Sequence, residues 1–69
     1  MEINVNKYIA SHGKQPRGYG QWAFCPAEHY NSDNYIEHTM FYTGKYTETK
    51  KSATAYFRSH NVQVIIVCP

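Results

Sequence analysis

The sequence has no long hydrophobic run and little charge of either sign. No apolar segment in the 69 residues approaches the roughly 20 that a membrane-spanning helix needs, and no apolar leader follows Met1. Charged residues make up 17% of the chain and the formal net charge is +2. A dedicated DNA-binding domain usually carries a denser cationic face. We therefore expect a cytoplasmic protein that does not contact membranes.

Cysteine is scarce, which argues against a disulfide framework or a zinc finger. Cys25 and His29 have no matching second pair of ligands at zinc-finger spacing. The residues that could supply soft metal ligands are Cys25, Cys68, His12, His29, His38 and His60. Because their spacing is irregular, we expect neither a metal ion nor another cofactor. Whether Cys25 and Cys68 pair with each other is left open.

The chain also lacks the common catalytic and phosphate-binding motifs. There is no Walker loop, GxGxxG or HExxH sequence, and the segment Gly18–Gly20 is too short to cradle a phosphate. A ribonuclease-like mechanism could use His12, His29 and His38, with Lys14 or Arg17 to hold the phosphate. No motif ties these residues together. We therefore expect a protein that is not an enzyme. A small ribonuclease ranks third, after the two binding functions described below.

What the chain does have is enough apolar material for one folded domain over residues 1–69. Apolar residues make up 42% of the sequence and aromatic residues 16%, which is too hydrophobic for a disordered chain. Four segments have the alternating or β-branched composition of strands: Ile3–Ser11, Tyr19–Cys25, Tyr35–Tyr42 and Val62–Cys68. The last is the most apolar, so it is expected in a central or otherwise well-covered position.

One helix is predicted between the third and fourth strands, from Glu48 to His60. Apolar residues recur within it at spacings of three and four, which gives a single apolar stripe. Thr47 is a suitable N-cap, and Gly44 is expected to break the strand before it. Asn61 can adopt the left-handed backbone conformation that ends a helix.

These elements predict an α+β fold in the order β-β-β-α-β. Short links favour an antiparallel meander for the first three strands. A right-handed crossover then brings the last strand beside the first and parallel to it, which gives a strand order of 3-2-1-4. The result is a four-stranded, mostly antiparallel sheet with one helix packed on one face. The other face is expected to be free for binding or for dimerisation, so both a monomer and a homodimer are considered.

The most distinctive segment is His12–Phe24, with the sequence HGKQPRGYGQWAF. Its glycines and Pro16 favour a loop that presents Lys14 and Arg17 outward, and Trp22 is expected to anchor its base in the core. The residues predicted to contact a partner are His12, Lys14, Arg17, Tyr19, Tyr30 and Tyr35. A secondary basic patch is predicted at Lys45, Lys50 and Lys51.

Two kinds of binding are compatible with this surface. A tyrosine-rich, lightly charged sheet face has the composition of a protein interface, which favours docking on a protein or nucleoprotein complex. The alternative is direct nucleic-acid binding, in which Lys14 and Arg17 hold phosphate and Tyr19 or Trp22 stacks on a base. The secondary basic patch at Lys45, Lys50 and Lys51 would add to the phosphate contacts.

Three segments, HGKQPRGYGQWAF, YTETKKSATAYF and VQVIIVCP, carry a resemblance to short uncharacterised proteins of phage and plasmid origin. Together they cover about half of the chain. The resemblance implies a protein that acts in the cytoplasm of a host cell. There it would bind a host protein or nucleoprotein complex as an inhibitor or adaptor, in the way that anti-CRISPR proteins do. It assigns no role to any individual residue.

Overall fold

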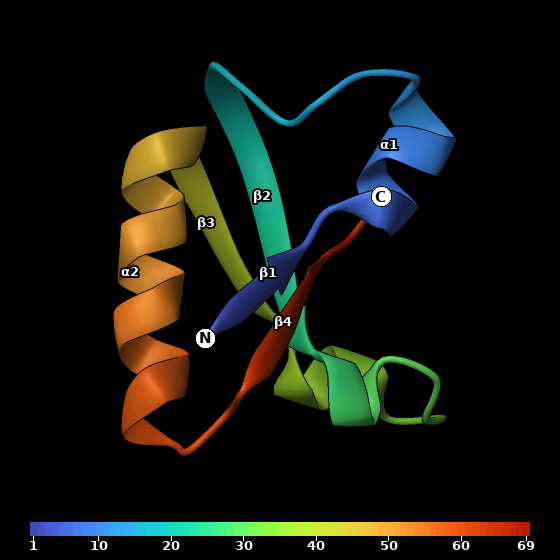
Figure 1. Cartoon of the computed structure of the whole chain (residues 1–69), viewed down its shortest axis with the longest axis vertical. Helices are drawn as coiled ribbons and strands as arrows, with labels where there is room; N and C mark the ends of the chain where they lie inside the picture. The colour runs from blue at the N-terminus through green and yellow to red at the C-terminus, as the bar shows by residue number, and fades with distance from the viewer.

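The computed structural model describes residues 1–69 as an α+β fold, which confirms the predicted class (Figure 1). The strands are β1 (Glu2–Asn4), β2 (Tyr19–Pro26), β3 (Met40–Lys45) and β4 (Val64–Val67). The α-helices are α1 (Asn6–His12) and α2 (Tyr46–Ser59), and two short 3-10 turns, η1 (Ala27–His29) and η2 (Tyr35–His38), lie between β2 and β3.

The four strands form one sheet in the order β1-β4-β2-β3. β4 is parallel to β1 and antiparallel to β2, and β2 is antiparallel to β3. The predicted parallel pairing of the first and last strands and the central position of the last strand are confirmed. The predicted order 3-2-1-4 is wrong, because β4 inserts between β1 and β2. Ile65 and Val67 are fully buried, whereas β1 is short and polar and therefore suits an edge.

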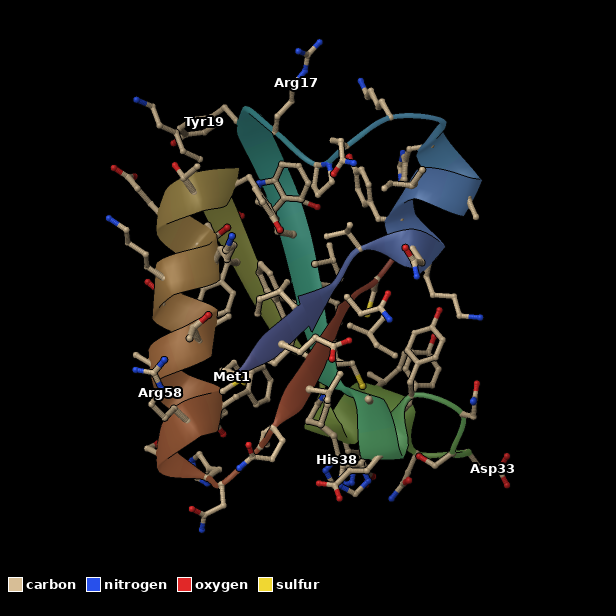
Figure 2. All side chains as sticks on the ribbon, in the orientation of Figure 1. Met1, Arg17, Tyr19, Asp33, His38 and Arg58 are labelled. Atoms are coloured by element: carbon tan, nitrogen blue, oxygen red, sulfur yellow. The ribbon has the colours of Figure 1, made fainter.

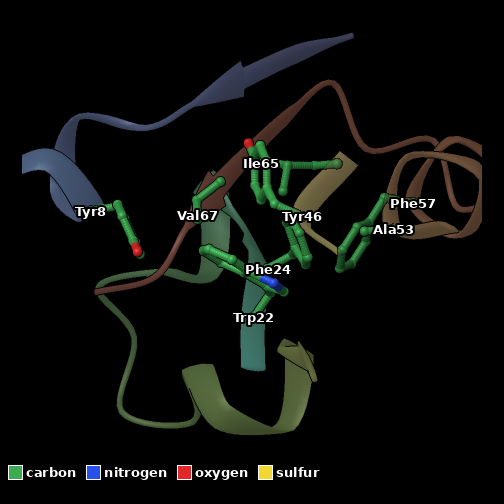
Figure 3. Packing of buried hydrophobic residues seen from close by; sticks show 8 residues of the cluster. All are labelled: Tyr8, Trp22, Phe24, Tyr46, Ala53, Phe57, Ile65 and Val67. Atoms are coloured by element: carbon green, nitrogen blue, oxygen red, sulfur yellow. The ribbon is translucent and has the colours of Figure 1, made fainter. Parts of the chain in front are cut away.

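The hydrophobic core lies between α2 and one face of the sheet. Trp22 pairs with Tyr42 and Phe24 with Met40 across the β2–β3 ladder, so these side chains share the face that α2 covers. The buried cluster in Figure 3 consists of Tyr8, Trp22, Phe24, Tyr46, Ala53, Phe57, Ile65 and Val67. The predicted role of Trp22 as a core anchor agrees with its burial.

The segment Ile3–Ser11 differs most from its prediction as one strand. Only its start lies in β1, and the chain then turns into α1, so the prediction of a single helix is also wrong. The Asn4 side chain accepts a hydrogen bond from the Asn6 N–H at 2.9 Å and stabilises the turn. Val5, Tyr8 and Ile9 then follow at helical spacing, with Tyr8 buried in the core.

The predicted strand Tyr35–Tyr42 is only half correct. Its first half is η2, which is closed by a hydrogen bond of 2.8 Å from the Thr39 hydroxyl to the Tyr35 carbonyl. β3 then begins at Met40 and includes Gly44, which therefore does not break it. Gly44 lies opposite Gly20, and its φ of 148° is one that favours glycine.

Helix α2 begins two residues earlier than predicted. Lys45 occupies the N-cap position and makes no side-chain cap, so the prediction of Thr47 as the cap is wrong. The Tyr46 N–H instead donates to the Gly18 carbonyl at 2.8 Å, which ties the helix start to the glycine-rich loop. After the helix, Asn61 has a φ of 62°, as predicted. Neither α1 nor α2 has the length and apolarity needed to cross a bilayer.

The face of the sheet opposite α2 is not wholly free, contrary to the prediction. Cys25 points to this face and is fully buried, because the segment 27–38 folds over it; the Cys25 thiol lies 3.9 Å from the Tyr35 carbonyl. Further along the β2–β3 hairpin the same face is open. We call this part the open face; its residues are Tyr19, Gln21, Ala23, Phe41, Thr43 and Lys45.

Candidate binding site

The candidate site begins with a break in the sheet beside β2. β3 pairs with β2 from Tyr19 to Phe24, whereas β4 pairs with it only from Phe24 to Pro26. One further bond, from the Cys68 N–H to the Ala23 carbonyl at 2.9 Å, marks where β4 leaves. Beyond it, the first half of β2 has a strand neighbour on one side only. Helix α1 and the loop that follows it lie across the gap (Figure 1).

This gap contains a hollow of about 580 Å³, which we call the basic groove. Its lining comes from α1, the loop, β2, β3 and the residues after β4. Four of the six predicted partner-binding residues are brought together here: His12, Lys14, Arg17 and Tyr19. No aspartate or glutamate side chain lines the groove, so its fixed side-chain charges are those of Lys14 and Arg17.

Aromatic rings form one wall of the basic groove. The Tyr8 and His12 rings of α1 stack with centroids 4.1 Å apart, and the Tyr8 ring lies 5.6 Å from that of Trp22. The Trp22 indole N–H donates to the Gly44 carbonyl at 2.9 Å, which fixes the ring against the hairpin. Because Tyr8 and Trp22 also belong to the core, this wall is built from a rigid part of the molecule.

The loop between α1 and β2 is held at both ends. Gly13 caps α1 with a φ of 71°, and Gly18 has a φ of 80°; both values favour glycine. Pro16 is buried in the middle of the loop, whereas Lys14 and Arg17 are exposed. Figure 2 shows Arg17 projecting away from the body of the protein, at the same end as Tyr19. The sequence correctly indicated a loop that presents these two cations.

The open face continues the groove across the hairpin. Tyr19 is 78% exposed and Phe41 is 66% exposed, and both lie on this face. Lys45 is opposite Tyr19 in the ladder, so one member of the predicted secondary basic patch lies beside the groove. Lys50 and Lys51 are on α2, with the Lys50 ammonium 5.9 Å from the Tyr46 ring, and neither lines the groove.

Two residues that sequence reasoning missed complete this surface. Phe41 had a detectable signal, because alternation in β3 places its side chain on the opposite face from Met40 and Tyr42, which pack against the core. The role of Tyr8 could be found only from the fold, since it lines the groove from a helix that had been predicted as a strand.

Tyr30 and Tyr35, the other two predicted contact residues, lie away from the basic groove. Their ring centroids are 6.2 Å apart in the segment 27–38, and the Lys7 ammonium lies 5.8 Å from the Tyr30 ring. Burial raises the pKa of the Tyr30 hydroxyl, with smaller contributions from neighbouring Cys68, Tyr35 and Cys25. Neither tyrosine is in the lining of the basic groove.

Both cysteines are free thiols in the structure. Burial raises the pKa of the Cys68 thiol to about 11, and the nearby Cys25 adds to this shift. Burial also raises the pKa of Cys25. At neutral pH these thiols are therefore protonated, and neither has the thiolate character of a nucleophile.

A second, smaller hollow of about 210 Å³ lies at the other end of the hairpin. The His29 and His38 rings stack there with centroids 3.6 Å apart, and Glu28, Glu37 and His60 are also in the lining. The structure contains no group of three histidine, cysteine or acidic side chains arranged to hold a metal ion.

The residues considered for a ribonuclease mechanism lie in two different hollows. His12, Lys14 and Arg17 line the basic groove, whereas His29 and His38 line the second hollow. Figure 2 shows Arg17 and His38 at opposite ends of the molecule. The predicted acid–base pair and its phosphate-binding cation are therefore not assembled in one place.

Comparisons with protein families, with curated proteins and with solved structures find no match to this chain. The resemblance to phage and plasmid proteins therefore stays a prediction.

Proposed function

We propose that this chain is a small binding protein without catalytic activity, which docks on a protein or nucleoprotein complex through the basic groove and the open face. The observation that carries the proposal is the combination of a hollow whose charged side chains are those of Lys14 and Arg17 with two exposed aromatic rings on the adjoining sheet face. Neither Tyr19 nor Phe41 contributes its ring to the core cluster.

The residues of this surface have favourable energetics for docking. Burial of Tyr19 and Phe41 against a partner removes apolar area from water at about 25 cal/mol per Å². Tyrosine and arginine are also among the residues that contribute most to binding energy in interfaces. Lys14 and Arg17 add attraction for an acidic partner, which raises the association rate.

The size of the protein suits a binder that acts by covering its partner. Its accessible surface is 4674 Å², so a standard interface of about 800 Å² on each side would take about a sixth of it. A binder of this kind blocks or bridges its partner without turning over a substrate. An inhibitor or adaptor of a host complex, as the resemblance implies, is a role that such a surface can perform.

The test is capture of partners from a lysate of the native host, followed by mass spectrometry. We expect a partner that the wild-type protein captures and that the double variant Lys14→Ala/Arg17→Ala loses. Lys51→Ala/Arg58→Ala is the matched control, since it also removes one lysine and one arginine side chain, but from α2 and away from the groove. If the control loses the partner and the groove variant keeps it, the proposed surface is wrong.

Direct nucleic-acid binding is the second candidate, because Lys14, Arg17 and Tyr19 combine cations with an exposed ring that a base can stack on. It predicts that a fluorescent 12-nucleotide oligo(dT) binds the purified protein and that its affinity falls steeply with added salt. Loss of that binding in Lys14→Ala/Arg17→Ala would support this candidate. Absence of binding to both DNA and RNA oligonucleotides at low salt would exclude it.

A further inference from the structure

We propose that the basic groove receives an extended acidic segment of the partner, which adds to the free edge of β2 as a further strand. The proposal rests on the proposed function and specifies how the partner is held. It places main-chain hydrogen bonds, and not only side-chain contacts, at the centre of binding.

The hydrogen-bonding pattern shows which residues of β2 face the groove. The Ala23 carbonyl accepts the Cys68 N–H, so the backbone groups of Ala23 point away from β3. Backbone direction alternates along a strand, so Tyr19 and Gln21 point to the same side as Ala23. None of the backbone hydrogen bonds outside the helices and strands involves Tyr19 or Gln21. Their N–H and C=O groups are therefore available to an incoming strand.

The groove gives such a strand a place to lie. The end of β4 borders it, because Cys68, which still bonds to the Ala23 carbonyl, and Pro69 are both in its lining. A segment that enters beside them would take the β4 position along β2. The edge from Tyr19 to Ala23 is about 13 Å long at the rise of an extended strand, which is enough for about four residues of a partner.

The chemistry of the lining favours an acidic segment. Lys14 and Arg17 are the fixed side-chain charges of the groove. Because no aspartate or glutamate lines the groove, acidic side chains of the partner would meet two cationic side chains and no acidic one. Tyr19, which is 78% exposed, offers apolar surface to side chains of the segment at one end of the groove.

The experiment tests one backbone N–H. Gln21→Pro removes the N–H that faces the groove and leaves the β2–β3 ladder bonds in place, because Gln21 directs its backbone away from β3. Gln21→Ala is the matched control that shortens the side chain and keeps the N–H. The probe is a displayed library of random 12-residue peptides selected on the wild-type protein, and the enriched peptides are then synthesised.

We expect the enriched peptides to be rich in aspartate and glutamate. Their affinity should fall at least about tenfold in Gln21→Pro, as expected when main-chain pairing is lost. The affinity for Gln21→Ala should exceed that for Gln21→Pro, because both variants lack the glutamine side chain and only the proline variant lacks the N–H. The affinity should also weaken in Lys14→Ala/Arg17→Ala. If Gln21→Pro does not fold, as judged by its thermal melt, the same test is made on the ligand. Peptides N-methylated at alternate amides should then lose binding to the wild-type protein.

Three results would overturn the proposal: no enrichment of acidic peptides, equal affinity for Gln21→Pro and wild type, or equal affinity of the N-methylated and plain peptides. Competition by oligo(dT) with full retention in Gln21→Pro would instead assign the groove to nucleic acid. Docking itself is judged separately, by partner capture from lysate. If Gln21→Pro keeps the partner and Lys14→Ala/Arg17→Ala loses it, docking stands and strand addition is refuted.

Discussion

The two faces of the β2–β3 hairpin are built from alternate residues of the same strands, yet they have opposite properties. Trp22 and Phe24 point toward α2 and are buried with Tyr46 in the core. Tyr19 and Phe41 point the other way, and more than half of each side chain is exposed. One ladder of hydrogen bonds therefore positions both the core and the open face.

The difference shows where this small chain has surface to spare for binding. Its core uses only a few large side chains, and helix α2 covers them on one side of the sheet. On the other side, the segment 27–38 covers the hairpin at its Pro26 end and leaves the Tyr19 end open. Tyr19 and Phe41 lie at the two ends of the open face, so a partner that covers this face would bury both rings.

The difference in burial between the two faces is tested most directly by truncating one phenylalanine on each face. Phe24 is fully buried, so Phe24→Ala should lower the free energy of unfolding by about 3–5 kcal/mol through lost burial and a residual cavity. Phe41→Ala should change it by less than about 0.5 kcal/mol, since its side chain is mostly in water. Urea denaturation measures both. Similar losses for the two variants would show that the open face is part of the core.

A second, smaller effect concerns alkaline pH. The pKa of Cys68 is raised from 9.0 to about 11, and burial also raises that of Tyr46 above 10.0. The unfolded chain therefore loses these protons at a lower pH than the folded protein does. Stability from this source is present below pH 9 and is lost as the pH rises toward 11. A shift of two pKa units corresponds to about 3 kcal/mol for a shielded group, and water at the half-buried Cys68 thiol reduces this.

Urea midpoints at pH 8, 9.5 and 10.5 measure this loss, which should be smaller in Cys68→Ala. The variant separates the thiol on the open side of the sheet from Tyr46 on the packed side. An unchanged pH dependence in Cys68→Ala would assign the alkaline loss to Cys25 and the tyrosines, whose pKa values are also raised.

The sequence predicted those parts of the fold that a local pattern determines. Alternation identified β2, the run of β-branched residues identified β4, and the apolar stripe identified α2. Helix α1 was missed because Val5, Tyr8 and Ile9 were fitted to an imperfect strand pattern that runs through Lys7. The position of β4 between β1 and β2 depends on how the strands pack in the tertiary structure, and a local sequence pattern does not determine this.

For the candidate site too, the sequence predicted the features that depend on local patterns and not those that depend on tertiary structure. Glycines and cations indicated the loop with Lys14 and Arg17, because those residue types act locally. The groove itself exists because β4 leaves β2 at Cys68 and α1 lies across the gap. Both facts belong to tertiary structure, so the sequence could not bring Tyr8 to the same place as Arg17. It also grouped Tyr30 and Tyr35 with residues that lie elsewhere.

Glycine substitutions test the backbone conformation of the loop that borders the open face. Gly13→Ala and Gly18→Ala should each destabilise the protein by about 1 kcal/mol, because both positions have a positive φ that alanine adopts with strain. A methyl group would meet no atom within 4 Å at either position, so backbone strain is the whole effect. Gly20→Ala is the control, since Gly20 has no such φ and its added methyl would touch the Trp22 ring at 3.9 Å. Thermal melts should show losses at Gly13 and Gly18 and none at Gly20.

The smallest expected effect lies in the segment that covers the other end of the hairpin. His29 and Glu28 approach to 3.7 Å, but the Glu28 side chain is 71% exposed, so solvent screens the pair. Glu28→Gln should therefore change the free energy of unfolding by less than about 0.5 kcal/mol. Thr39→Val should cost more, about 1 kcal/mol, because it removes the hydrogen bond from a buried hydroxyl to the Tyr35 carbonyl. Urea denaturation at pH 7 compares the two variants. A larger loss in Glu28→Gln than in Thr39→Val would mean that charge, and not η2 packing over Cys25, holds this cover on the sheet.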